Sequence, residues 1–70
     1  MNENERATVS KIVFTTAEAA EQVGVSMPIL LRWVHMDGGI PHFRSSRKIL
    51  IPRQALIEWV NKQAEMGAVL

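Results

Sequence analysis

The 70-residue sequence predicts one small, mainly α-helical domain with three short helices and a two-stranded β-hairpin. Apolar residues recur at helical spacing in three segments, and Gly24 and the Gly38-Gly39 pair interrupt them as helix ends do. Between residues 40 and 52, two short β-prone runs flank a polar Ser-Ser-Arg sequence, which indicates the hairpin. A chain of this length buries only about 60% of its unfolded surface, so we expect a small core.

Composition excludes several classes of protein. There is no cysteine, which rules out a disulfide scaffold, a thiol nucleophile and a thiolate zinc site. The 47% hydrophobic content is typical of a folded globular domain. No apolar run approaches the ~18 residues of a membrane span, and the start of the chain lacks the pattern of a signal peptide. We expect a cytoplasmic protein with no membrane partner.

Charge is distributed unevenly along the chain, although the net charge is only +1. Residues 1–31 contain four acids and two bases, a balance of −2. Residues 32–53 contain one acid, Asp37, and five bases, a balance of +4: Arg32, Arg44, Arg47, Lys48 and Arg53. This basic strip predicts a polyanion-binding face on a nearly neutral molecule.

The first helix follows a polar, aperiodic stretch, residues 1–12, which we interpret as a flexible tail. Thr15 is a suitable N-cap, and Glu18 three residues later completes a capping box. Phe14 stands in the position of a hydrophobic staple, and Gly24 is the expected stop.

The second helix starts after a very short connection. Ser26 is an N-cap candidate, and Pro28 is tolerated because N–H groups of the first turn have no acceptor within the helix. The pair of helices with a tight glycine-containing turn is a helix-turn-helix arrangement. On the second helix, the side predicted to face the core holds Leu30, Trp33 and Val34. The opposite side holds Pro28, Arg32 and His35, with Met27 and Leu31 on one shoulder.

The hairpin and the third helix complete the domain. By the period of two, Phe43, Ile49 and Ile51 are predicted to share one face of the hairpin. Pro52 suits a helix start, and the apolar spacing of the following residues predicts a third helix over 53–64. We therefore expect a folded domain over residues 13–64 and a frayed end over 65–70.

Function is predicted from two surfaces that are each weak evidence alone. An exposed helix face is usually just solvated, and a basic turn usually only protects a sheet edge. A second helix that fits the major groove beside a basic β-ribbon, however, forms a surface suited to double-stranded DNA. On the second helix the candidate DNA-binding residues are Ser26, Met27, Pro28, Leu31, Arg32 and His35. On the hairpin they are Arg44, Ser45, Ser46, Arg47 and Lys48, with Thr15 and Thr16 as phosphate contacts at the start of the first helix.

Other site chemistry finds little support in the sequence. His35 and His42 have no nearby carboxylate pair, so we expect no metal site. No phosphate-binding glycine loop, acid pair or activated nucleophile can be assembled, so we expect neither an enzyme nor a cofactor. Trp33 and Trp59 are interpreted as packing anchors.

The runs TTAEAAEQVGVS, LLRWV and IPHFRSSRKILIPRQALIEWV occur in this order over about residues 13–62. Together they resemble the excisionase-type winged helix-turn-helix family, which is related to the MerR DNA-binding domain. The resemblance implies a second helix in the major groove and a hairpin, the wing, in the adjacent minor groove. Small stand-alone members are recombination directionality factors, which bend DNA and direct an integrase towards excision of a phage or mobile element; others regulate transcription. Because the chain ends at Leu70, we expect the stand-alone role.

Departures from the family pattern leave alternatives open. Positions that are usually polar, aromatic or basic in the family hold apolar residues here: Met27, Pro28, Ile29, Leu31 and Leu50. We therefore expect modest sequence discrimination by one copy, supplemented by DNA shape, by cooperative self-association on DNA and by an integrase partner. A transcriptional regulator of a mobile element is the second interpretation. The third is a protein-interaction module that uses the patch formed by Met27, Ile29, Leu31 and Leu50.

Overall fold

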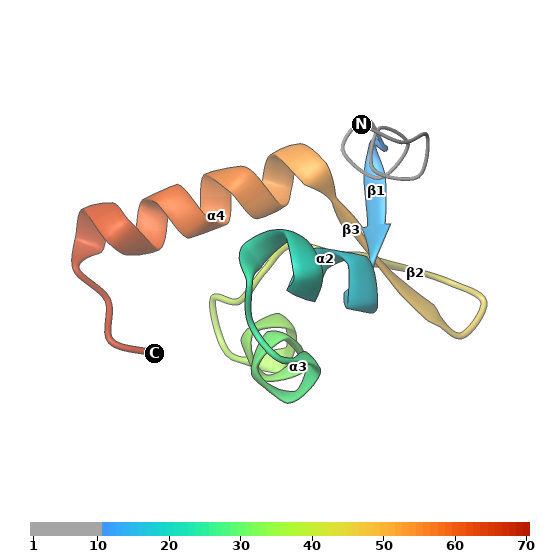
Figure 1. Ribbon diagram of the computed structural model, residues 1–70, viewed down its shortest axis with the longest axis horizontal. Coiled ribbons are helices and arrows are strands. Elements are labelled where there is room, and N and C mark those ends of the chain that lie inside the picture. The colour runs from blue at the N-terminus through green and yellow to red at the C-terminus, as the bar shows by residue number, and fades with distance from the viewer. Residues whose placement is uncertain (1–10) are drawn as a thin grey trace.

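The computed structural model describes residues 11–70 and has the predicted helices and hairpin, together with one further strand (Figure 1). Most of the flexible tail predicted for residues 1–12 lies outside the described residues. The elements in chain order are β1 (Val13–Thr15), α2 (Thr16–Val23), α3 (Met27–His35), β2 (Phe43–Ser45), β3 (Lys48–Pro52) and α4 (Arg53–Met66). The β2–β3 hairpin projects from one end of the molecule, and the C-terminal half of α4 extends towards the other end (Figure 1).

The sheet has three antiparallel strands in the order β1-β3-β2, so the predicted hairpin gains a partner from the start of the chain. Phe14 of β1 pairs with Ile51 of β3, and both side chains are buried. The backbone N–H of Arg53 donates to the carbonyl oxygen of Ile12 at 2.7 Å, which continues the pairing past the end of β3. The segment that leads into α2 is therefore fixed against the hairpin.

The register of the hairpin corrects one prediction. Phe43 pairs with Leu50, so its side chain lies on the sheet face opposite Ile49 and Ile51 and is 47% exposed. The cause is the two-residue turn, which pairs Ser45 with Lys48 and thereby fixes which residues share a face. The prediction that Phe43, Ile49 and Ile51 share a face is therefore wrong for Phe43.

The core lies where α2, α3 and α4 meet the inner face of the sheet. Its largest fully buried side chains are Leu30, Ile40 and Ile51. The remaining buried members are Phe14, Ala19, Ala20, Val34, Leu56 and Trp59. Trp59 packs against Trp33 with 5.6 Å between ring centroids, and its Nε1 donates to the carbonyl oxygen of Gly38 at 2.9 Å. This contact ties α4 to the loop that follows α3.

The end of α4 also differs from the prediction. The helix continues to Met66, two residues past the predicted end at residue 64. Gly67 then adopts the left-handed conformation at φ 64°, and its N–H donates to the carbonyl oxygen of Ala64. Gly67 thus acts as a helix stop, and the helix includes Glu65 and Met66, which the predicted helix over 53–64 did not.

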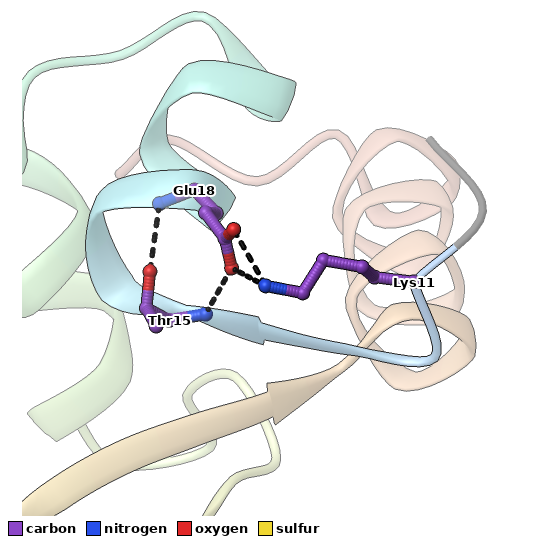
Figure 2. Close-up of polar contacts among 3 residues, drawn as sticks. All are labelled: Lys11, Thr15 and Glu18. Carbon is purple, nitrogen blue, oxygen red and sulfur yellow. Dashed lines mark hydrogen bonds and ion pairs between the residues drawn. The ribbon is translucent and has the colours of Figure 1, made fainter. Parts of the chain in front are cut away.

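The capping box predicted for the first helix is present at α2. The N–H of Glu18 donates to Thr15 Oγ1 at 3.2 Å, and the N–H of Thr15 donates to Glu18 Oε1 at 2.9 Å (Figure 2). Lys11 Nζ lies 2.6 Å from Glu18 Oε2 and 2.8 Å from Oε1. The Lys11 ammonium and the Thr15 N–H hold the pKa of Glu18 below its usual value of 4.5.

This pKa shift predicts a pH dependence of stability that Lys11 controls. A carboxylate with a lowered folded-state pKa stabilises the fold above its unfolded-state pKa, and the contribution is lost as the pH falls through the folded-state pKa. The substitution Lys11→Met is therefore expected to reduce the free energy of unfolding at pH 6–7 and to have less effect near pH 3. Urea unfolding of both proteins at each pH measures this difference. An equal effect at both pH values would contradict the assigned ion pair.

Candidate nucleic-acid interface

One side of α3 is exposed over the whole length of the helix. At 100° per residue, its five side chains occupy an arc of about 140°. They are Met27, Leu31, His35, Pro28 and Arg32, in that order around the axis, with Leu31 half-buried and the others exposed. Ile29, about 60° beyond Arg32, is also exposed. Of the three residues predicted to face the core, Leu30 and Val34 are buried and Trp33 is partly buried against the core. The helix therefore presents one continuous face to solvent.

The position of α3 is fixed by its connection to α2. Gly24 adopts φ 89°, and the N–H groups of Gly24 and Val25 both donate to the carbonyl oxygen of Ala20, at 2.8 and 3.0 Å. The small side chains of Ala19 and Ala20 are buried in the same core cluster as Leu30 and Val34 of α3, which lets the helices approach closely. Ser26 has N-cap backbone geometry, but its side chain makes no capping hydrogen bond and lies exposed.

The β2–β3 hairpin presents the cations of the basic strip. Ser46 is the first residue of its two-residue turn and has a φ of 57°, a left-handed conformation that is uncommon for a non-glycine residue. Arg44, Arg47 and Lys48 are all exposed. Within residues 11–70, no carboxylate lies within ion-pair distance of these three side chains or of Arg32. Their charges are therefore available to an external anion.

A cleft of about 350 Å³ joins α3 to the hairpin. It is lined by Thr15, Thr16, Met27, Leu31, Arg47, Lys48 and Ile49. Six of these residues are candidates predicted from the sequence. The seventh, Ile49, was predicted only to share a hairpin face with Ile51, and it packs partly against the core. The lining thus combines three apolar side chains with two cations and two hydroxyls, which suits a ligand with both apolar and anionic parts.

The remaining candidate residues lie outside this cleft on the same two elements. Ser26, Pro28, Arg32 and His35 are exposed on or beside α3, and Arg44, Ser45 and Ser46 are exposed on the hairpin. A larger cavity of about 610 Å³ lies between α2 and α4, lined by apolar and amide side chains with Arg53 as its one charged residue. The cleft is the better candidate for nucleic acid because it adjoins the exposed cations.

The predicted apolar patch is not continuous. Leu50 pairs with Thr15 and Phe43, so its side chain lies on the sheet face opposite that of Ile49. Met27 and Leu31 contribute to the cleft, whereas Ile29 is exposed on another side of α3. Ile49, rather than Leu50, is the strand residue that accompanies Met27 and Leu31.

The start of α2 carries its own charge balance. The Thr15 hydroxyl oxygen accepts the Glu18 N–H, while its hydrogen stays available to donate (Figure 2). The Glu18 carboxylate occupies the helix N-terminus, where an anion is stabilised, and Lys11 neutralises it. This end of the cleft therefore offers hydroxyl groups to a phosphate rather than net positive charge.

The described residues contain no group of three or more side chains that could hold a metal ion. His35 and His42 lie edge to face with ring centroids 6.3 Å apart, and His42 Nδ1 lies 2.9 Å from the carbonyl oxygen of Ile40. None of the helices in this part of the chain is long and apolar enough to cross a membrane.

Comparison with known proteins agrees with this architecture. A family model described as a helix-turn-helix domain matches residues 13–64, which is most of the chain. Neither a curated protein nor a solved structure matches the chain. The family binds DNA and includes excisionase-like proteins. The exposed α3 face, the cationic hairpin beside it and the family match agree, and the chain belongs to this helix-turn-helix family.

Proposed function

We propose that this protein is a small architectural protein that binds double-stranded DNA and directs an integrase towards excision of a phage or mobile element. In this proposal α3 enters the major groove and the hairpin follows the adjacent minor groove. The protein performs no chemistry itself, because strand cleavage belongs to the integrase. Cooperative binding of several copies would extend the short contact that one copy makes.

The observation that carries the proposal is the contrast between the hairpin and the exposed arc of α3. The hairpin presents cations that form no ion pair with any carboxylate among residues 11–70, whereas Arg32 and His35 are the polar side chains on the exposed arc of α3. Phosphate contacts fix the position of a protein on DNA, and base contacts supply specificity. A surface with many cations for phosphate contacts and few polar side chains for base contacts favours a protein that shapes DNA over one that selects a single operator sequence.

DNA binding by this surface predicts a defined salt dependence. Arg32 in the major groove and the phosphate-contacting Arg44, Arg47 and Lys48 are each expected to displace about one counterion, so log K should fall with log salt at a slope of about −3.6. Affinity should thus decrease by about two decades between 50 and 200 mM salt. Fluorescence anisotropy with a labelled duplex measures the slope, and a slope near zero would rule out DNA as the partner.

The excisionase role needs a separate experiment. An integrase gene and an attachment site next to the gene for this protein would supply the components of an in vitro excision assay. Addition of the protein should raise the yield of excised circle and lower the yield of integration. DNA binding without any effect on either yield would retain the DNA-binding proposal and contradict the excisionase role.

A further inference from the structure

We propose that the side of α3 facing the hairpin reads the 5-methyl groups of thymine in the major groove. The inference rests on the proposed DNA binding and specifies what chemistry the protein selects in its target. It arises from the cleft, where apolar side chains lie between cations and hydroxyl groups.

The cleft has a cationic part that suits the phosphates of a DNA strand and an apolar part that suits its bases. Arg47 and Lys48 lie on the hairpin side, where they can contact phosphates. Met27 and Leu31 are one helical turn apart on α3, and Ile49 of β3 completes the apolar part. With phosphates held by the hairpin, the base edges of that strand lie against α3. The 5-methyl group of thymine is the apolar feature that base pairs present in the major groove.

Guanine readout by Arg32 is separated from this apolar side on the helix. Arg32 lies about 140° around the axis from Met27, between Pro28 and Ile29. Arginine recognises the O6 and N7 atoms of guanine, whereas Met27 and Leu31 have no hydrogen-bond donor. We therefore expect a target in which thymine lies on the hairpin side of α3 and guanine lies on the Arg32 side.

Deoxyuridine tests this inference because it differs from thymidine only in lacking the methyl group. Two selections are run in parallel from random 20-bp duplex libraries, one made with thymine and one with uracil. The thymine library is expected to yield sites with both thymine and guanine preferences. The uracil library should keep the guanine preference and lose the preference at the thymine positions.

Single substitutions in a selected duplex then measure the effect of each methyl group. Removal of one contacted methyl should weaken binding by about fourfold, from the burial of one apolar carbon. 5-Methylcytosine in place of cytosine at such a position should strengthen binding by a similar factor. Equal affinity for thymine and uracil at every position, in a protein that still binds DNA with the expected salt slope, would overturn the inference. Failure to bind either duplex would instead overturn the proposed function.

Matched variants identify the residues responsible. Met27→Ala and Leu31→Ala are each expected to bring the ratio of affinities for thymine and uracil duplexes close to one. Arg32→Ala should keep this ratio and lose the guanine preference. Ile29→Ala is the control, because Ile29 is an exposed apolar residue of the same helix outside the cleft. Met27 is 39% exposed, so Met27→Ala keeps the fold even if Leu31→Ala destabilises it. A ratio unchanged in Met27→Ala and in folded Leu31→Ala would contradict the assignment.

Discussion

Substitution of Gly39 by alanine is expected to destabilise the domain strongly, by about 3–5 kcal/mol. A Cβ atom at this position would lie 2.1 Å from the carbonyl oxygen of Trp33 and 2.8 Å from that of Met36. Those oxygens accept the N–H groups of Ile40 and Gly39 at 3.0 Å, so relief of the clash breaks both hydrogen bonds and shifts Ile40, which is 1% exposed. The melting temperature should fall by about 12 °C or more, as measured by circular dichroism.

Gly38→Ala is the matched control one residue earlier. Gly38 has a φ of 69°, but a Cβ atom there would contact nothing within 4 Å. Its cost is the left-handed conformation alone, about 1–2 kcal/mol. A positive φ is the usual reason for a glycine, and by that rule Gly38 would be the more sensitive position. If Gly38→Ala reduced the stability more than Gly39→Ala, the close packing of Gly39 against the end of α3 would be contradicted.

The helices could be predicted from the sequence because their end signals are local. The capping box at Thr15 and Glu18 and the glycine stop at Gly24 involve residues within one helical turn of each other. The alternation of buried and exposed positions on α3 follows from helical rotation alone. Such features need no knowledge of the rest of the fold, and the predicted starts and stops of α2 and α3 agree closely with the structure.

The sheet could be predicted only in part, because its pairing is not local. β1 is three residues long, too short for an alternating pattern, and it becomes a strand by pairing with β3 nearly 40 residues later. The face on which Phe43 lies depends on the length of the turn: a turn one residue longer would pair Phe43 with a different residue. Two β-prone runs around polar residues do not determine that length.

In the candidate site, too, the local features could be predicted and those that depend on strand pairing could not. The cations and α3 residues could be named from the charge distribution and the helical pattern. The choice between Ile49 and Leu50 required the register, since neighbouring residues of a strand face opposite sides of the sheet. The sequence held one signal for Ile49, because it directly follows the cations Arg47 and Lys48. In the structure its side chain lies on the same sheet face as the buried Phe14 and Ile51.

The wing cations are expected to have the largest effect on DNA binding. Each phosphate contact contributes about 0.9 to the salt slope and about 0.9 decades of affinity at 0.1 M salt relative to 1 M. The triple substitution of Arg44, Arg47 and Lys48 by glutamine should therefore weaken binding by about 500-fold at 0.1 M salt. The slope should change from about −3.6 to about −0.9. These side chains are exposed and contribute to no ion pair among residues 11–70, so the fold should persist, as circular dichroism can verify.

A single substitution at each end of the molecule separates a wing contact from an effect of net charge. Arg47→Gln and Lys62→Gln remove one positive charge each, but Arg47 lies in the hairpin turn and Lys62 on the distant half of α4 (Figure 1). Arg47→Gln should weaken binding about eightfold at 0.1 M salt and reduce the slope by about 0.9. Lys62→Gln should leave the slope unchanged, because a charge beyond a Debye length of about 10 Å from the DNA is screened. Equal losses from the two variants would mean that affinity follows the total charge of +1 rather than the position of the hairpin, and would contradict the assigned interface.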